Sequence, residues 1–239
     1  MSFIDKKLLS ALAEKYAVSL DAEAIERFDL YAELLVDWNE KINLTAITEP
    51  REIVVKHFAD SLCALKYVDI PVGASVIDVG TGAGFPGAAL LIARPDIKLT
   101  ALDSTGKKLT VIENILDRLG LNAQTLHMRA EEASRKKEYR EKYDFAFARA
   151  VAPMAILSEY CLPFVKTGGT FVAMKAAKAA QELNEAQGAI KLLGGELSAF
   201  DTFELEDAGE RSILQIKKVQ QTSPKYPRQA AKIAKNPLR

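Results

Sequence analysis

Cysteine is scarce in this sequence, which has only Cys63 and Cys161, far apart along the chain. Two distant cysteines cannot form a disulfide framework, a four-cysteine zinc site or an iron–sulfur cluster. We therefore expect two reduced thiols packed in the core, and we predict no metal site.

Long apolar runs are also missing, because charged residues interrupt every such stretch well before the roughly 20 residues needed to cross a bilayer. Residues 1–7 lack the apolar region and cleavage site of a signal peptide. The sequence has no exposed apolar stripe that would indicate a dimer interface. The sequence therefore predicts no membrane association, a cytoplasmic location and a monomer. Its 239 residues, 49% hydrophobic and 27% charged, suit one large globular domain with a helical appendage.

Acidic residues are absent from the end of the chain, where the segment 211–239 holds eight basic residues and no acid. Since the whole chain has 32 basic and 32 acidic residues, the part before this segment is acidic. A basic tail gains affinity for a polyanion by displacing the counterions of its phosphates. A nucleic-acid partner and a merely solvated terminus are both compatible with this pattern.

The first 70 residues have the periodicity of helices. Within 21–39, apolar residues recur at three- and four-residue steps and mark one face of a helix: Ile25, Phe28, Tyr31, Leu34, Leu35 and Trp38. A second helix is predicted to begin at Thr48 or Glu49 and to reach Leu65, with Pro50 in its first turn, where a missing N–H is tolerated. We predict an N-terminal helical extension over residues 1–70.

After Pro71 the pattern changes to alternating strands and helices. Short apolar runs predict buried parallel strands at 75–79, 98–102, 143–148 and 170–174. A helix that ends at Gly120 lies among them, and 195–203 with 212–219 are predicted to pair antiparallel at one edge, since no helix separates them. This order predicts an α/β domain over 71–219, with a doubly wound, mostly parallel sheet. The basic tail, 220–239, is predicted to be loosely structured.

A glycine-rich loop, DVGTGAGFPG at 78–87, follows the first predicted strand and opens a helix. Glycines at positions 80, 82 and 84 permit a tight turn and let a ligand approach the main chain. The start of the next helix offers free N–H groups to an anion. In doubly wound sheets ligands bind at this end of the strands.

The next strand ends in Asp103 and Ser104. A carboxylate at that position can accept hydrogen bonds from both hydroxyls of a ribose. Together with the glycine loop it predicts a cofactor that contains adenosine. The alternative is a glycine-rich turn with an aspartate that caps a helix.

The identity of the cofactor depends on Asp78. Gly82, Gly84 and Gly87 also satisfy the dinucleotide pattern G-x-G-x-x-G. A carboxylate beside the crevice would repel a pyrophosphate, whereas S-adenosylmethionine carries an ammonium and a sulfonium and no phosphate. We therefore predict S-adenosylmethionine, with an NAD-type oxidoreductase as the alternative.

Two further segments are predicted to border the crevice. Ala130 and Glu131 follow a further strand candidate, which lies between the strands predicted at 98–102 and 143–148, and could flank the adenine. Arg149 comes at the end of the strand predicted at 143–148. Its guanidinium could hold a phosphate or a cofactor carboxylate in bidentate fashion or, alternatively, form a surface ion pair.

The same region narrows the chemistry. The chain lacks the Asn/Asp-Pro-Pro segment that enzymes methylating exocyclic amino groups share, and Cys161 lacks the preceding proline of enzymes that methylate a pyrimidine carbon. A ring nitrogen or a hydroxyl remains as the methyl acceptor.

An ordered set of motifs resembles one family over nearly the whole chain. The motifs are WN at 38–39, NLT at 43–45, KHFADSL at 56–62, the loop at 78–87, DS at 103–104, KK at 107–108, RAE at 129–131, RAVA at 149–152, Lys175 and KYPR at 225–228. They are similar to those of the bacterial small-subunit (16S) ribosomal RNA guanine-N7 methyltransferases, historically called glucose-inhibited division protein B. The tail departs from the family pattern at Ala231 and Ile233, where glycine and proline are frequent.

The resemblance implies a class I methyltransferase of Rossmann-like fold that acts on N7 of a guanosine. It implies that Gly80, Phe85, Ala130, Glu131 and Arg149 contact S-adenosylmethionine, with Asp103 near the ribose.

No catalytic acid or base is predicted, because N7 has an in-plane lone pair and loses no proton on methylation. His57 is interpreted as a polar-face or capping residue of its helix. Arg149, Lys175, Lys225 and Arg228 are candidate RNA contacts, since phosphate contacts position a substrate that base contacts select. A non-catalytic RNA-binding assembly factor that retains the pocket is a further alternative.

Overall fold

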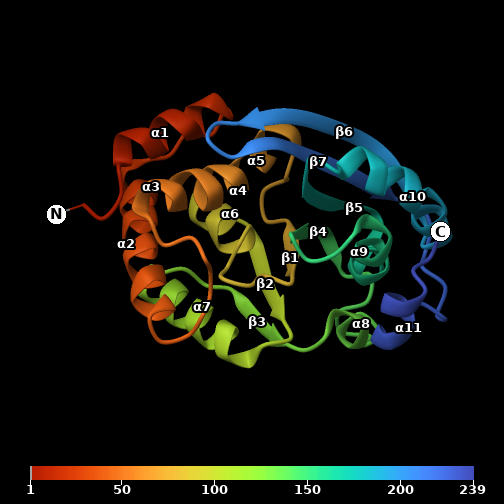
Figure 1. Cartoon of the computed structure of the whole chain (residues 1–239). Coiled ribbons are helices and arrows are strands. Elements are labelled where there is room, and N and C mark those ends of the chain that lie inside the picture. Colours follow the sequence, from red (N-terminus) through yellow and green to blue (C-terminus); the bar gives the residue numbers. More distant parts are fainter. Residues whose placement is uncertain (1) are drawn as a thin grey trace.

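A computed structural model describes residues 2–239 and shows a sheet of seven strands covered by helices on both faces (Figure 1). The strand order is β3-β2-β1-β4-β5-β7-β6, with parallel pairing from β3 to β5 and antiparallel pairing at β7 and β6. The strands are β1 (Ser75–Val79), β2 (Lys98–Asp103), β3 (Gln124–His127), β4 (Tyr143–Arg149), β5 (Val165–Ala176), β6 (Gly195–Leu205) and β7 (Gly209–Lys218). The predicted α/β class and the antiparallel edge pair are confirmed.

The helices divide between the two faces of this sheet. The first group is α1 (Lys6–Lys15), α2 (Ala22–Asn39), α3 (Pro50–Glu52), α4 (Asp60–Leu62), α5 (Ala64–Tyr67), α6 (Gly87–Ala93) and α7 (Gly106–Arg118). The second group is α8 (Ala130–Ala133), α9 (Met154–Cys161), the 3₁₀ turn η2 (Leu162–Phe164), α10 (Ala179–Leu192) and α11 (Ala230–Lys235). Across residues 2–239, none of these helices is both long enough and apolar enough to span a membrane.

Aspartates begin the first two helices. Asp5 accepts hydrogen bonds from the backbone N–H groups of Lys7 and Leu8, and Asp21 accepts one from Ala24. Each carboxylate thereby satisfies N–H groups that have no partner inside the helix. The periodic apolar face of α2 lies against the domain, with Phe28, Tyr31 and Leu35 fully buried.

The segment predicted as one helix over 48–65 contains an irregularity that the periodicity did not reveal. Its middle part, η1 (Ile53–Ala59), is a π-helix between α3 and α4. π-helical turns are rare and frequently accompany functional sites. This one carries His57, and Asp60 follows it directly.

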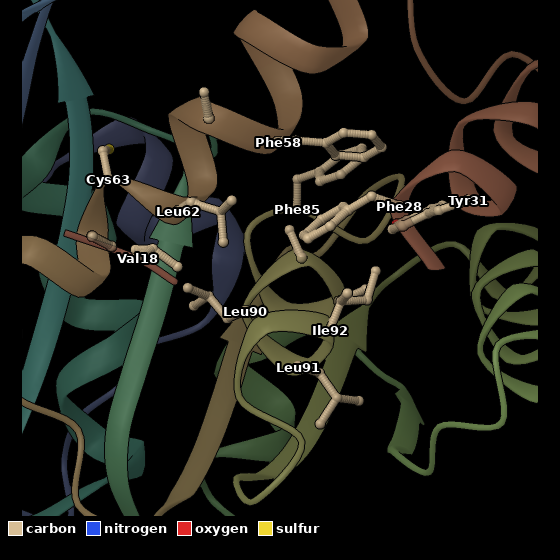
Figure 2. Packing of buried hydrophobic residues seen from close by; sticks show 14 of the residues in the cluster. Val18, Phe28, Tyr31, Phe58, Leu62, Cys63, Phe85, Leu90, Leu91 and Ile92 are labelled. Carbon is tan, nitrogen blue, oxygen red and sulfur yellow. The ribbon is translucent and has the colours of Figure 1, made fainter. Parts of the chain in front are cut away.

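The N-terminal helices share one hydrophobic core with α6, α7 and one face of the sheet. Figure 2 shows Phe28, Tyr31, Phe58 and Phe85 gathered where α2, η1 and the glycine-rich loop meet. The ring centroids of Phe28 and Phe58 are 4.8 Å apart, and those of Tyr31 and Phe85 are 5.4 Å apart. The first 70 residues therefore pack as part of the central core, and a domain division at residue 70 stays a prediction.

The opposite face is covered by α9, α10 and the C-terminal tail, and the prediction of a loose tail was wrong. The side chain of Ile233 is fully buried, and Arg228 pairs with the carboxylate of Glu159, which has no solvent exposure (Nη2–Oε2 2.7 Å). A buried carboxylate requires a countercharge, which the tail provides. The backbone carbonyls of Thr222 and Tyr226 also accept hydrogen bonds from Arg140.

Both cysteines are buried and free, in agreement with their predicted packing role. Burial raises the pKa of each thiol, so neither is a reactive thiolate at neutral pH.

Candidate functional site

A pocket of about 470 Å³ lies at the carboxyl ends of β1, β2 and β4, and its size suits a small-molecule ligand. Eight of the ten residues predicted to bind the cofactor line it: Gly80, Gly82, Phe85, Asp103, Ser104, Ala130, Glu131 and Arg149. Asp78 and Gly84 do not line it.

The three glycines of the loop serve different purposes. All have positive φ, +76° at Gly80, +59° at Gly82 and +96° at Gly84, a region that favours glycine. A Cβ on Gly82 would have no neighbour closer than the Gly80 carbonyl oxygen at 3.9 Å, so space for a ligand is open there. A Cβ on Gly84 would instead overlap the hydroxyl of Tyr31, which donates to the Ala83 carbonyl oxygen (2.6 Å). Gly84 therefore makes room for α2 rather than for a ligand.

Asp78 lies behind the loop instead of beside the pocket. Its side chain is fully buried, and Oδ2 accepts hydrogen bonds from Thr81 Oγ1 (2.7 Å) and from the Gly87 N–H (2.9 Å). Its other oxygen has no hydrogen-bond partner among residues 2–239. Burial raises the pKa of Asp78 to about 6, against the opposing effect of the two donors. Asp78 thus braces the turn, and the prediction that it lies beside the crevice, where it would repel a pyrophosphate, was wrong.

Asp103 borders the pocket and holds the loop at the same time. Its Oδ2 accepts from the Gly82 N–H (3.0 Å) and its Oδ1 from the Thr105 N–H (2.8 Å). A carboxylate oxygen can accept a second hydrogen bond, so both oxygens can still receive ribose hydroxyls. These contacts fix the carboxylate beside the open space at Gly82.

The remaining wall suits an adenosine. Leu102 and Met128 supply apolar surface, while Ala130 and the buried Glu131 begin the short helix α8 beside them. The pocket thus offers apolar surface for a base, an acceptor for a ribose and open main chain at Gly82. The residues present therefore fit S-adenosylmethionine.

His57 is a pocket residue that sequence reasoning misjudged, because its environment comes from distant parts of the chain. The ring is buried and stacks on Phe85, with centroids 4.3 Å apart. Its Nδ1 is 3.3 Å from Arg149 Nη2, and its Nε2 is 2.9 Å from Thr45 Oγ1. An arginine can only donate, so Nδ1 accepts and Nε2 carries the proton, which it donates to Thr45. Burial, followed by the charge of Arg149, lowers the pKa of His57 to about 3, so the ring is neutral.

Arg149 is engaged in a buried network rather than in the surface ion pair considered as its alternative. Its Nη1 donates to Asp60 Oδ2 (2.7 Å), and the other oxygen of Asp60 accepts from Arg211 Nε (2.8 Å). The guanidinium also lies 5.2 Å from the centre of the Phe85 ring. The network joins β4, β7 and the residue after η1, and leaves one edge of Arg149 on the pocket wall.

The candidate RNA contacts differ in availability. Lys175 Nζ is 2.7 Å from Glu182 Oε2 and donates to the Ala152 carbonyl oxygen (2.8 Å). Arg228 is paired with Glu159, whereas Lys225 is exposed over the ring of Tyr226. The charges of Lys175 and Arg228 are therefore not available to an RNA phosphate, because a carboxylate of the same chain already neutralises each one.

The loop before α3 also reaches the pocket, through Leu44 and Thr45. Their sequence signal was the NLT motif at 43–45, which is part of the resemblance but which no chemical argument had singled out. Val151 and Tyr160 also line the pocket; Val151 belongs to the RAVA motif at 149–152, whereas Tyr160 carried no signal.

Comparisons with known proteins agree with this fold and pocket. Residues 24–214 match the GidB family, described as rRNA small subunit methyltransferase G. Proteins named ribosomal RNA small subunit methyltransferase G are 46% identical in a Geobacillus species (98% of this chain, 100% of the relative), 45% in Bacillus subtilis (98% of each) and 42% in Clostridium perfringens (100% of each).

Solved structures show the same fold at low sequence identity. A putative methyltransferase from Bacillus halodurans superimposes with a TM-score of 0.52 (14% identity; 68% of this chain, 100% of that one). A SAM-dependent O-methyltransferase from Thermotoga maritima also gives 0.52 (16% identity; 79% and 73%), and M. jannaschii TYW2 in complex with AdoMet gives 0.50 (12% identity; 62% and 70%). The oxidoreductase alternative has no support in these relationships. The chain belongs to the GidB family, rRNA small subunit methyltransferase G, and is a class I methyltransferase that depends on S-adenosylmethionine.

Proposed function

We propose that this enzyme methylates N7 of a guanosine in small-subunit ribosomal RNA. The observation that carries the proposal is the state of His57. It is the pocket residue best suited by type to remove a proton at neutral pH, yet neither of its ring nitrogens is free. An acceptor that loses no proton agrees with such a site, and guanine N7 is one because its lone pair lies in the plane of the ring.

When bound, S-adenosylmethionine supplies an electrophilic methyl group, and the side chains around it have to bind and orient. We propose that Asp103 accepts hydrogen bonds from the ribose and that Gly82 admits the ligand to the main chain. Phe85 and His57, stacked on each other, form a rigid wall that Arg149 holds from behind. Such fixed surroundings favour in-line attack, because positioning alone can contribute several kcal/mol (~7–11) to a barrier.

We propose that RNA phosphates contact the half-buried Lys108 and the exposed Arg129 of the pocket, together with Lys225. Lys108 and Arg129 line the pocket, and neither forms a salt bridge within the described part of the chain. We propose Lys108 and Arg129 as RNA contacts in place of Lys175 and Arg228, because carboxylates of the chain neutralise the charges of the latter two. Contacts of this kind position an RNA without selecting its sequence.

The test is methyl transfer from labelled S-adenosylmethionine to small-subunit particles and to naked 16S RNA from cells that lack this protein, followed by mass-spectrometric mapping of the product. One 7-methylguanosine is expected in RNA treated with the enzyme. A methyl group on any other atom would refute the proposed acceptor. Salt-sensitive RNA binding without transfer, unaffected by Asp103→Asn, would favour the non-catalytic assembly factor.

We also propose that the enzyme works as a monomer in the cytoplasm, where its ribosomal substrate is found. Light scattering at micromolar concentration is expected to give a mass near 26.2 kDa. A stable mass twice as large would exclude the monomer.

A further inference from the structure

A second cavity, of about 600 Å³, adjoins the cofactor pocket at the same end of the sheet. The two share His57, Arg149 and Ala150 as lining residues. The second cavity continues past the end of β5 and the start of α10, where Glu182 and Lys178 line it. Two ligands, one in each cavity, would therefore approach each other beside the three shared residues.

The walls of the second cavity combine apolar surface with two carboxylates, those of Asp60 and Glu182. Both oxygens of Asp60 already accept hydrogen bonds from arginines, so Glu182 is the carboxylate available to a ligand. Ile47, Met174 and Ile213 provide flat apolar surface. Oε2 of Glu182 accepts a hydrogen bond from the Met154 N–H (2.9 Å) and forms an ion pair with Lys175 Nζ (2.7 Å). These bonds fix the position of the side chain, whereas Oε1 has no hydrogen-bond partner within residues 2–239. A fixed acceptor on an apolar wall is a typical arrangement for recognising a planar ligand that donates hydrogen bonds.

Guanine matches this arrangement better than the other bases. Its Watson–Crick edge carries two adjacent donors, N1–H and the 2-amino group, and Oε1 of Glu182 has two lone pairs that can accept both. Adenine presents an acceptor at N1 and has no 2-amino group. In guanine this edge lies across the ring from N7. A base whose donor edge meets Glu182, which lines only the second cavity, therefore turns N7 toward the wall shared with the cofactor pocket.

We infer that the second cavity receives the target guanine and that Glu182 selects it by accepting hydrogen bonds from its N1–H and 2-amino group. Lys178, exposed at the same cavity and without a salt bridge in the described chain, contacts the phosphate of the target nucleotide. The inference rests on the proposed function and adds the residue that determines base specificity.

The experiment uses small-subunit particles reconstituted with 16S RNA that carries either guanosine or inosine at the mapped target position. Inosine keeps N7 but lacks the 2-amino group. Wild-type enzyme is expected to lose about tenfold or more in kcat/KM on inosine, the effect of one hydrogen bond to a charged group. Glu182→Gln, which keeps the size of the side chain and an acceptor for Met154, is expected to lower kcat/KM on guanosine and to make the two substrates nearly equivalent.

Glu185→Ala removes an exposed carboxylate from the same helix outside the cavity and is the matched control, with guanosine preference unchanged. Should Glu182→Gln fail to fold, Ala177→Trp tests the cavity, because Ala177 is exposed and lines it. This variant is expected to bind S-adenosylhomocysteine normally and to transfer at least tenfold more slowly.

Equal rates of wild type on both substrates would overturn the inference, as would a Glu182→Gln variant that retains the wild-type ratio or an Ala177→Trp variant of wild-type activity. In all three cases methyl transfer to guanosine N7 would persist and the proposed function would stand. Absence of transfer by the wild type to either RNA would instead refute the proposed function.

Discussion

Alanine at two neighbouring glycines of the loop should have different effects, although both residues have positive φ. At Gly82 an added Cβ has no neighbour within 3.8 Å, and at Gly84 it overlaps the Tyr31 hydroxyl and approaches Ile112 Cδ1 to 2.9 Å. Gly82→Ala therefore adds backbone strain and a methyl group in ligand space. Gly84→Ala adds the same strain and forces Tyr31 away from the Ala83 carbonyl oxygen.

The expected magnitudes follow from these contacts. Left-handed backbone costs alanine about 1–2 kcal/mol, which is the whole effect expected for Gly82→Ala on the free energy of unfolding. Overpacking adds about 1–3 kcal/mol at Gly84. Loss of the buried Tyr31 hydrogen bond adds about 1 kcal/mol more. Gly84→Ala should therefore destabilise the fold by roughly 3–6 kcal/mol, the sum of these terms.

Urea unfolding followed by circular dichroism measures both variants, with the slope m as a check on the two-state assumption. Affinity for S-adenosylhomocysteine, measured by calorimetry, should fall for Gly82→Ala, the variant that is the more stable of the two. Tyr31→Phe removes the overlapping hydroxyl, so the double variant with Gly84→Ala should be more stable than the sum of the single effects predicts. Equal stability losses at the two glycines, or additivity with Tyr31→Phe, would refute the assigned role of Gly84.

Three further predictions concern buried charges. The folded-state pKa of Asp78 is raised from 3.8 to about 6. The free energy of unfolding of the wild type, relative to that of Asp78→Asn, should therefore be greatest below pH 3.8 and should fall by about 3 kcal/mol as the pH rises through 6. A difference independent of pH would contradict this. The ¹⁵N resonances of His57 should stay those of a neutral ring protonated at Nε2 from pH 8 down to pH 5, and titration near 6.5 would show that the ring is not enclosed as described. Arg228→Met should lower the free energy of unfolding by about 3–5 kcal/mol, because it leaves Glu159 buried without a countercharge. Adding Glu159→Gln should restore much of the lost stability, as measured by thermal unfolding. A loss below about 1 kcal/mol for Arg228→Met would exclude a buried pair.

Local patterns in the sequence were sufficient for most of the sheet. The first apolar run predicted β1 with its observed bounds, and the helical stripe ending at Gly120 predicted α7. Both elements are predicted by the periodicity of apolar residues over a short window, which can be seen in the sequence alone. The glycine loop and Asp103 were found for the same reason, since strand ends and turn residues are local signals.

Interactions between distant segments could not be predicted from the sequence. Arg228 and Glu159 are 69 positions apart, so a tail rich in basic residues gave no indication that one of them neutralises a buried carboxylate. Lys175 has a partner nearby in the sequence, Glu182, but the two residues belong to different elements, β5 and α10, whose relative placement the sequence does not show. At Asp78 the chemical type was right for a ligand contact, but only the packing shows that its oxygens face the turn.

The pocket wall connects parts of the chain that the sequence had divided into an extension and a domain. His57 comes from the π-helix η1, Phe85 from the glycine loop, Arg149 from β4 and Arg211 from β7, and the carboxylate of Asp60 joins the two arginines. Removing Asp60 would leave both arginines without their carboxylate, and removing Arg149 would leave Nδ1 of the buried His57 without its donor. Either loss costs more than the loss of an exposed ion pair. A reaction that needs no proton transfer gains nothing from a reactive side chain but depends on a wall that does not move. We therefore expect the helices before residue 70 to support catalysis, because they provide one side of that wall.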